Sequence, residues 1–374
     1  MDSARIHALT MPKWGLAMTE GRIAAWLVEE GAEVGPGVEV VDIETDKITS
    51  GLEPSVNGVL RRRVARPNET VPVGGLVAVI AGASVPDPEI DSFVADFQSA
   101  FVPAAAIEDS AGPAPETVQV NGVRLRYLKR NEGGVPGLLL HGFGGDLNNW
   151  LFNHEALASN RAVYALDLPG HGGSEKLPQH HSLQDFADTV AAFLDAAGFE
   201  RVHLAGHSIG GAIALRTAAA HPDRVASLTL IAPAGLGKEI DAEYIEGFIA
   251  ANRRKDIKPI LDRLFADPSL AGRQLVDDVL KYKRMDGVVS NLRDIAGTFC
   301  LHGEQAESVR DLLARIAAPV MVIWGRDDRI IPCAHAVGLP AGVITHILPG
   351  SGHMVQMEAA SKVNRLLESF WSQF

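Results

Sequence analysis

The most restrictive feature of the chain is a set of short, continuously apolar segments that recur through residues 117–374 and are separated by longer amphipathic stretches. Such segments are typical of strands covered on both faces, and their alternation with helices predicts a mostly parallel sheet between helical layers. The predicted strands are Gly137 to Leu140, Ala162 to Leu166, Arg201 to Ala205, Ser227 to Ile231, Val320 to Trp324 and Ile344 to Leu348. This region is therefore predicted to fold as an α/β domain.

The stretches between these strands carry helical and turn signals. Apolar positions recur with a helical period at Leu183 to Ala197, Gly211 to Ala220 and Glu358 to Trp371. The Asn121-Gly122 pair between two alternating segments is typical of a type I′ hairpin turn. Amphipathic stretches interrupt the alternation at about residues 236–300, which predicts a helical cap there.

Residues 1–81 follow another pattern. Short Val/Ile/Leu segments are interrupted by Gly or Pro, without a helical period, which predicts a small all-β domain. Two of its apolar-alternating segments meet at Asp46-Lys47, so Lys47 is predicted to lie on an exposed hairpin turn.

Residues 82–116 have the composition of a linker. They are rich in Ala, Pro and Ser and hold seven acidic residues without a Lys or Arg, so we expect an extended chain. A free coil of that length spans roughly 35 Å. Apolar positions at helical spacing nevertheless predict a helix at 88–102, either docked on one of the two domains or serving as a docking helix for a partner subunit. These positions are Ile90, Phe93, Val94, Phe97 and Phe101.

Overall composition limits the classes of function. A net charge of −12 argues against nucleic-acid binding, and the one basic run, Arg61 to Arg63, is interpreted as a solvated strand edge. The two cysteines, Cys300 and Cys333, belong to no paired motif, which suits a reducing compartment. Neither a signal core nor an apolar run of about 18 residues is present, so we expect a cytoplasmic protein without membrane segments.

The segment Gly206-His207-Ser208-Ile209-Gly210 has the pattern G-x-S-x-G between a predicted strand and a predicted helix. In that context the pattern predicts a sharp turn that holds Ser208 clear of the sheet as a nucleophile. Candidate companions end three other strands: His141 to Gly145, Trp324 to Pro332, and Gly350 to His353. The order Ser, Asp, His resembles that of the α/β-hydrolase family, as does the whole of residues 117–374.

Chemistry and this resemblance assign the roles. A serine hydroxyl needs a base, here His353, and the base needs a carboxylate that fixes its tautomer. Asp328 is preferred to Asp327, because in the resembled motif the acid stands four residues before the proline, here Pro332. The backbone N–H groups of Phe143 and Ile209 are predicted to form the oxyanion hole.

Three other polar features are interpreted as structural. Asp167 and His207 are assigned to packing or turn chemistry. The pair His180-His181 has no third ligand at metal spacing and is interpreted as a polar loop, so no metal is expected.

The segments Met11 to Gly21, Glu44 to Lys47 and Gly58 to Leu60 resemble the lipoyl domain of 2-oxo acid and acetoin dehydrogenase complexes. The resemblance implies lipoate in amide linkage on Lys47. A biotin carrier is the alternative, but that family brackets its lysine with methionines, whereas Asp46 and Ile48 stand here. Lys13 is a competing lysine in what is interpreted as a packed loop.

The combination of the two domains resembles the acetyltransferase components of bacterial acetoin dehydrogenase complexes. It implies transfer of an acetyl group from lipoyl-Lys47 to coenzyme A through Ser208. It also implies a thiamine-diphosphate-dependent dehydrogenase component and dihydrolipoamide dehydrogenase as partners. The basic run Arg253-Arg254-Lys255 of the predicted cap is either an ordinary solvated face or a feature that would attract the anionic coenzyme A.

The chain departs from the usual acyltransferases of 2-oxo acid dehydrogenases. It has neither their His-x-x-x-Asp-Gly motif nor a peripheral subunit-binding domain. Two alternatives therefore stay open: a serine ester or thioester hydrolase that carries a lipoyl domain, and a non-catalytic carrier or scaffold. A homo-oligomer is compatible with the sequence, which does not determine the oligomeric state.

Overall fold

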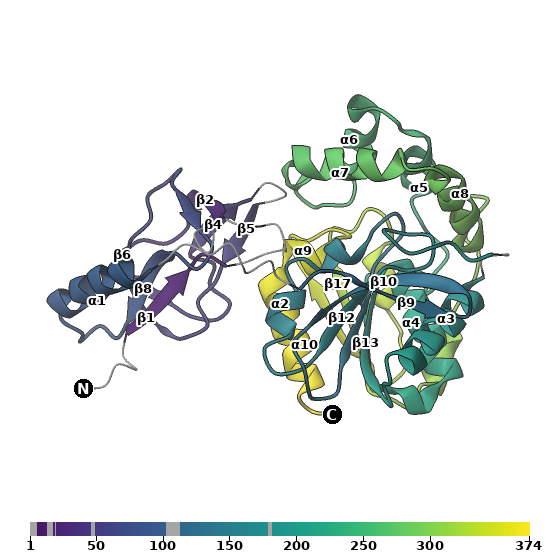
Figure 1. Ribbon diagram of the computed structural model, residues 1–374, viewed down its shortest axis with the longest axis horizontal. Helices are drawn as coiled ribbons and strands as arrows, with labels where there is room; N and C mark the ends of the chain where they lie inside the picture. The colour runs from purple at the N-terminus through teal and green to yellow at the C-terminus, as the bar shows by residue number, and fades with distance from the viewer. Residues whose placement is uncertain (1–5, 13–17, 19, 46–48, 102–112, 179–181) are drawn as a thin grey trace. The chain divides into compact units, whose positions relative to one another are not determined.

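The computed structural model describes residues 6–12, 18, 20–45, 49–101, 113–178 and 182–374. The chain divides into two compact units, and the main division falls between Gly112 and Pro113. Figure 1 shows the strands and one helix of the first unit and the large sheet with its helices in the second.

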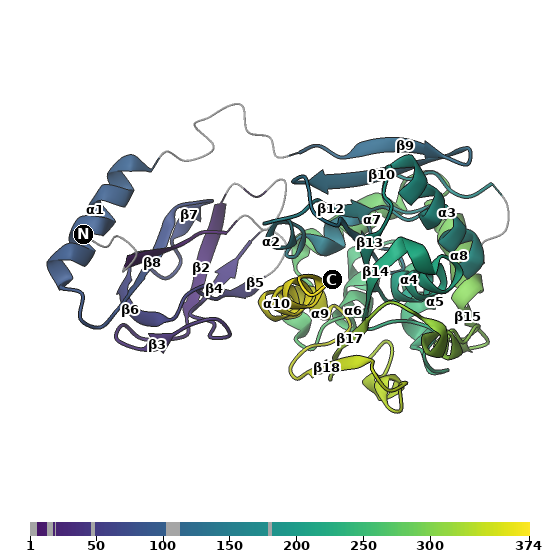
Figure 2. The ribbon, with the colours of Figure 1, turned by 90° about the horizontal axis from the view of Figure 1, so that it is seen from below.

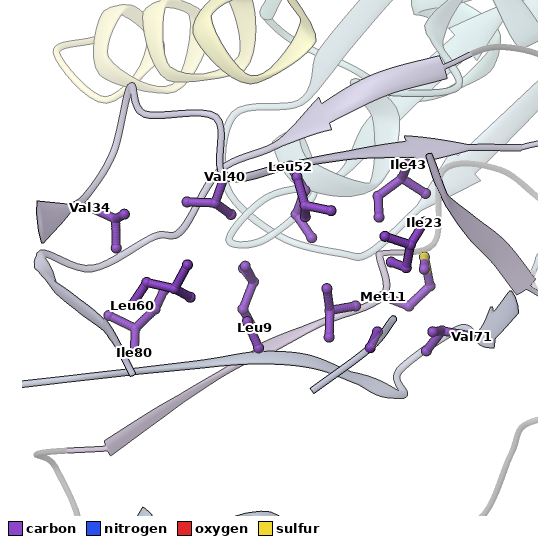
Figure 3. Packing of buried hydrophobic residues seen from close by; sticks show 14 residues of the cluster. Leu9, Met11, Ile23, Val34, Val40, Ile43, Leu52, Leu60, Val71 and Ile80 are labelled. Carbon is purple, nitrogen blue, oxygen red and sulfur yellow. The ribbon is translucent and has the colours of Figure 1, made fainter. Parts of the chain in front are cut away.

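The first unit is built from two four-stranded antiparallel sheets, as predicted for an all-β domain. One sheet contains β1 (Ile6–Thr10), β8 (Leu76–Ala81), β6 (Gly58–Arg63) and β3 (Glu33–Val34). The other contains β5 (Thr49–Leu52), β4 (Val41–Glu44), β2 (Glu20–Trp26) and β7 (Thr70–Pro72). Side chains from both sheets, such as Leu9, Ile43 and Leu60, point toward one another and form the core (Figure 3).

The strands on either side of the predicted lipoyl lysine are sheet neighbours. β4 and β5 pair antiparallel, and Glu44 lies opposite Thr49. The chain between them is therefore a short connection between adjacent strands. Lys47 itself, and the competing Lys13, lie outside the described residues.

A helix, α1 (Asp87–Ala100), packs on the first unit. Ile90 is fully buried in a cluster with Val79 of β8, and Phe93 and Phe97 pack against that cluster. The helix is thus docked on a domain of its own chain, which was one of the two predicted alternatives, and its apolar face is used in that contact. Figure 2 shows α1 beside β6 and β8.

Two interpretations made from the sequence need correction here. Arg61 and Arg62 are not simply a solvated strand edge, because they donate to Asp87 and Asp91 of α1 at 2.8 and 3.0 Å. The segment 82–116 is not extended throughout, since α1 occupies much of it. The acidic residues that were expected to stretch the linker are partly neutralised by these arginines, and the apolar face of the helix is buried.

The second unit is organised around an eight-stranded sheet. In sheet order its strands are β18 (Ile344–Leu348), β17 (Val320–Gly325), β14 (Val225–Ile231), β13 (Val202–His207), β11 (Gly137–Leu140), β12 (Val163–Leu166), β10 (Val123–Arg130) and β9 (Glu116–Val120). The pairs from β12 to β18 are parallel, and β9 and β10 form an antiparallel hairpin. The mostly parallel sheet and its six predicted strands are confirmed.

Local conformations explain two details of this sheet. Asn121 and Gly122 have φ values of +49° and +81°, as a type I′ turn between β9 and β10 requires. Ile344 of β18 is 44% exposed, although its apolar segment was expected to be covered on both faces. β18 is an edge strand, so its neighbours shield it less than the central strands.

Helices cover both faces of the sheet, as Figure 2 shows with α3 and α4 on one side and α10 on the other. The helices on or near the sheet are α2 (His154–Leu157), α3 (Leu183–Ala196), α4 (Ile209–Ala220), α9 (Val355–Glu358) and α10 (Ala360–Trp371). The predicted helix Glu358 to Trp371 corresponds to α10, begun two residues early, and α9 was not predicted. Short 3₁₀ helices are η3 (Leu147–Trp150), η4 (Pro222–Arg224), η5 (Pro268–Leu270), η6 (Arg310–Arg315) and η7 (Cys333–Ala336).

The predicted helical cap lies between β14 and β17. It consists of α5 (Ala242–Ala250), α6 (Arg254–Asp262), α7 (Arg273–Lys283) and α8 (Val288–Phe299), followed by the small pair β15 (Cys300–Leu301) and β16 (Glu304–Gln305). Figure 1 shows these helices, in green, gathered along one side of the sheet. Within the described ranges, no helix combines the length and the apolar character needed to cross a membrane.

Candidate active site

Ser208 sits on a sharp turn between β13 and α4. Its φ and ψ of +56° and −122° are an unfavourable combination for a residue with a side chain, as expected for a nucleophile elbow. Gly206 and Gly210 make the turn possible, because a Cβ on either residue would overlap a neighbouring backbone carbonyl. The tight turn presents Ser208 beyond the end of the strand, where it is 8% exposed.

His353 and Asp328 form a buried hydrogen-bonded pair. The distance from His353 Nδ1 to Asp328 Oδ2 is 2.8 Å, and the side chains are 3% and 0% exposed. Since an ionised carboxylate is an acceptor only, the proton lies on Nδ1 and leaves Nε2 free to accept another.

Asp328 is held in place by three further donors. The backbone N–H groups of Ile330 and Ile331 donate to Oδ1 at 2.8 and 3.0 Å. The indole Nε1 of Trp324 donates to Oδ2 at 3.0 Å. Together these hydrogen bonds fix the orientation of the carboxylate.

His207 precedes Ser208 in the sequence and contacts the candidate base, His353. Its Nε2 donates to the backbone carbonyl of His353 at 2.9 Å, and the two rings lie 4.8 Å apart. Burial holds the pKa of His207 well below its usual range, so the ring is neutral. The sequence interpretation as packing is therefore right in kind, but it missed that the packed partner is the candidate base. The position next to Ser208 was the signal that could have shown it.

The predicted oxyanion donors lie on the two segments that border Ser208. A Cβ on Gly142, the residue before Phe143, would come within 3.1 Å of Ser208 Cβ. Ile209 is the first residue of α4, where amides have no partner within the helix. Among the described residues, no hydrogen bond from the Phe143 or the Ile209 amide is found, which is compatible with the predicted role.

Asp327 and Asp167, the two other aspartates considered from the sequence, have structural partners. Asp327 accepts from Gly350 N at 2.9 Å and lies in an exposed loop. Asp167 is buried and accepts from Leu147 N, Gly173 N and Arg126 Nε. Burial raises the pKa of Asp167 to about 6, and its bonds join β10, η3 and the loop at Gly173. Both residues thus serve turn and loop structure, as expected from the sequence.

Aromatic side chains of the cap surround Phe143. The ring centroid of Phe143 lies 5.8 Å from that of Phe248 in α5 and 5.3 Å from that of Phe299 in α8. All three are buried. The cap therefore places an apolar cluster next to one of the predicted oxyanion donors.

The basic run of the cap is largely neutralised. Arg253 pairs with Asp256 at 2.8 Å, and Arg254 pairs with Asp277. The run therefore gives less support to an anion-binding role than the sequence suggested.

No group of three or more potential metal ligands occurs in the part of the chain that the structure describes. The pair His180-His181 lies outside that part.

Fold and site together define the class of protein: an α/β domain with a serine on a sharp turn between strand and helix, joined to a small all-β domain. Comparison with known families agrees. A family described as "alpha/beta hydrolase fold" matches residues 138–360, and one described as "Biotin-requiring enzyme", of the biotin and lipoyl type, matches residues 7–80.

Two relatives match almost the whole chain. A dihydrolipoyllysine-residue acetyltransferase component of an acetoin cleaving system from Pseudomonas putida is 50% identical, covering 98% of this chain and 99% of that protein. A component of the same name from Cupriavidus necator is 43% identical, covering 98% and 97%. The chain belongs to this family of acetyltransferase components, whose larger domain has the α/β-hydrolase fold.

Solved structures resemble the second unit. A meta-cleavage product hydrolase from Pseudomonas fluorescens has a TM-score of 0.64 and 22% identity, over 69% of this chain and 97% of that chain. At this identity the similarity concerns the fold alone.

Proposed function

We propose that the chain moves an acetyl group from a lipoyl group on Lys47 to coenzyme A, and that Ser208 carries the acetyl group in between. The observation that carries this proposal is the hydrogen bond between His353 Nδ1 and Asp328 Oδ2, in a domain that also holds Ser208 on a sharp turn between strand and helix. The first unit of the same chain is of the biotin/lipoyl type. The names of the two full-length relatives support acetyl transfer as the reaction.

The described flanks of Lys47 fit a lipoyl attachment site. β4 and β5 are antiparallel neighbours up to Glu44 and Thr49, as a carrier lysine between two strands requires. Lys47 would hold lipoate in amide linkage, and the bound group would supply a thiol for carrying acyl groups. We propose residues 1–81 as the lipoyl domain, with α1 docked on it, and residues 117–374 as the catalytic domain.

In the proposed first step, His353 Nε2 takes the proton of Ser208 Oγ while Oγ bonds to the carbonyl carbon of an acetyl thioester. The carbon–sulfur bond then breaks, the imidazolium returns the proton to the leaving sulfur, and the acetyl group stays on Ser208. In the second step the coenzyme A thiol gives its proton to His353 and bonds to the same carbon. Ser208 Oγ leaves and regains the proton.

Asp328 and two backbone amides would assist both steps. Asp328 fixes the tautomer of His353 and stabilises the imidazolium. The amides of Phe143 and Ile209 would stabilise the negative charge on the carbonyl oxygen of each tetrahedral intermediate.

Transfer to coenzyme A requires that water does not reach the acetylated serine. The buried cluster of Phe143, Phe248 and Phe299 is apolar and adjoins a proposed oxyanion donor. Apolar side chains at that position support transfer rather than hydrolysis, because they limit the access of water to the acetylated serine.

The relatives are components of a multi-component acetoin cleaving system. We propose a thiamine-diphosphate-dependent dehydrogenase component and dihydrolipoamide dehydrogenase as the partners of this chain. The free thiols of Cys300 and Cys333 are compatible with the reducing cytoplasm, where we propose that it acts.

The test uses the full-length lipoylated protein with acetyl-lipoamide as donor and measures acetyl-coenzyme A and acetate separately. We expect Ser208→Ala to lower acetyl-coenzyme A formation by at least about 10³-fold. Ser290→Ala, an exposed serine of α8, is the matched control and should match the wild type.

Equal acetate release with and without coenzyme A would identify a hydrolase, and the absence of both products in the wild type would identify a non-catalytic carrier or scaffold. Unchanged transfer in Ser208→Ala would show that Ser208 does not carry the acetyl group. The lipoyl site is tested by mass spectrometry of protein from cells supplied with lipoate. Lys47→Arg should abolish the lipoyl mass increment, whereas Lys13→Arg should keep it.

A further inference from the structure

The carboxylate of Glu358, the last residue of α9, links two backbone segments. Its Oε1 accepts from Gly352 N at 2.8 Å, and its Oε2 accepts from Ala266 N at 2.8 Å. Gly352 directly precedes His353, and Ala266 lies between α6 of the cap and η5. One side chain therefore joins the loop of the candidate base to the cap.

The same two segments also meet directly. Leu264 O accepts from His353 N at 2.8 Å and from Met354 N at 3.2 Å. A Cβ on Gly352 would lie 2.7 Å from Ala266 N, so the two backbones leave no room for a side chain there. The position of His353 consequently depends on where the cap segment 264–266 lies.

The loop of the candidate acid is attached to the same part of the cap. Ile330 O accepts from Asp241 N at 2.8 Å, and Asp241 also binds Arg263. Arg329 Nη2 lies 3.4 Å from Ala266 O. A shift of the cap would thus act on both members of the acid–base pair.

We propose that Glu358 is a positioning residue for the transfer reaction: it holds the cap segment 264–266 against the His353 loop, so that the base is aligned only while the cap covers the site. The inference rests on the proposed function, in which His353 activates Ser208 and then the coenzyme A thiol. Closure of the cap would in this way be tied to the alignment of His353.

The chemistry of the bridge requires a carboxylate. Both partners are N–H donors, and a carboxylate has an acceptor on each oxygen, whereas an amide has only one acceptor. Burial and the nearby Asp328 raise the pKa of Glu358 to about 7, while His353 lowers it. Among the described residues, the titratable or charged side chains placed near this bridge are Asp328, His353 and Arg329. Protonation would place an O–H group against one of the two donors and weaken the bridge.

The experiment compares Glu358→Gln with the wild type in the full-length protein, with p-nitrophenyl acetate as donor and coenzyme A as acceptor. We expect kcat for transfer to fall about 10- to 100-fold, as for a small misplacement of a catalytic group. We also expect more acetate per acetyl-coenzyme A. The acid limb of the pH profile should move to lower pH, because the glutamine of Glu358→Gln cannot be protonated and the variant therefore lacks the loss of the bridge that the wild type undergoes near pH 7.

Glu246→Gln is the control, since Glu246 is an exposed glutamate on α5 of the same cap. The inference is overturned if the two variants share the same kcat, product ratio and pH profile. Thermal unfolding would show whether Glu358→Gln fails to fold. In that case the inference is tested by hydrogen exchange in the wild type. Hydrogen exchange at Gly352 and Ala266, corrected for intrinsic rates, should show less protection below pH 7 than above it, and unchanged protection would also overturn the inference.

The two proposals fail in different ways. If Ser208→Ala transfers acetyl groups as well as the wild type, the proposed function is wrong, whatever Glu358 does. If Ser208→Ala is inactive and Glu358→Gln behaves as Glu246→Gln, only the positioning role is wrong.

Discussion

The two units supply their candidate functional residues in different ways. In the first unit, Lys47 belongs to the stretch that joins β4 to β5, two strands that are neighbours both in sequence and in the sheet. In the second unit, Ser208, Asp328 and His353 follow three different strands. The first arrangement needs one hairpin, whereas the second needs the whole sheet and part of the cap.

Because of this difference, substitutions in the two units should have different effects. A lipoyl site of this kind depends on local structure and on the stability of a small core. The acid–base site depends on hydrogen bonds between residues that are distant in sequence. Changes in one unit should therefore leave the other nearly unaffected, which can be measured.

The largest effect is expected for Asp328→Asn. The substitution removes the charge and the fixed tautomer of His353, and acetyl transfer should fall about 10⁴-fold. Asp327→Asn, one residue away in an exposed loop, should change the rate by less than about threefold. Steady-state assays give the rates, and mass spectrometry should show unchanged lipoylation in both variants. Similar losses in the two variants would contradict the assignment of the acid.

A loss of stability confined to the first unit is expected for Ile90→Ala. Ile90 is fully buried between α1 and β8, and removing its side chain should cost about 2–4 kcal/mol. Ser92→Ala on the exposed face of α1 is the control. Pulse proteolysis in urea, with protected fragments assigned to each unit by mass, measures both. An unchanged first unit would show that α1 does not contribute to its fold.

Acid should destabilise the second unit more than the first. Burial lowers the pKa of His141, His154 and His203 to about 4 each, below the ordinary value of 6.5. Between these values the unfolded chain binds protons that the folded chain does not, so stability falls as the pH falls through this window. A single such histidine would cost about 2 kcal/mol at pH 5.

The stability of the first unit should change with pH in the opposite direction. Burial raises the pKa values of Glu39 and Asp42, so their folded forms hold protons that the unfolded chain releases. Their contribution is present at low pH and is lost as the pH rises through the raised values. The urea midpoints of both units at about pH 7 and about pH 5 test this. Equal shifts in the two units would contradict the difference.

The smallest effect is expected for Arg62→Ala. Its ion pair with Asp91 of α1 is partly exposed, and such pairs contribute about 0.2–1 kcal/mol. Chemical unfolding at low and high salt measures it. The difference from the wild type should shrink as salt screens the pair, and a loss as large as that of Ile90→Ala would mean that charges rather than apolar packing hold α1.

Much of the fold could be predicted because its signals are local. The apolar strands, the Asn121-Gly122 turn and the elbow around Ser208 depend on neighbouring residues in the sequence, and the structure has them where they were expected. The choice of Asp328 over Asp327 came from a family pattern. It agrees with the hydrogen bond from His353, which only Asp328 accepts among these two residues.

The sequence by itself determined the two kinds of domain, the helical period of α1 and the residue types of the candidate site. The tertiary structure decided which surfaces these elements use: α1 docks on its own unit through its apolar face and also pairs with Arg61 and Arg62, His207 holds the backbone of His353, and Glu358 joins that loop to the cap. The physical reason is range. Propensities and turns act over a few residues, whereas a buried polar group takes its partner from whatever part of the chain the folded core brings within hydrogen-bond distance.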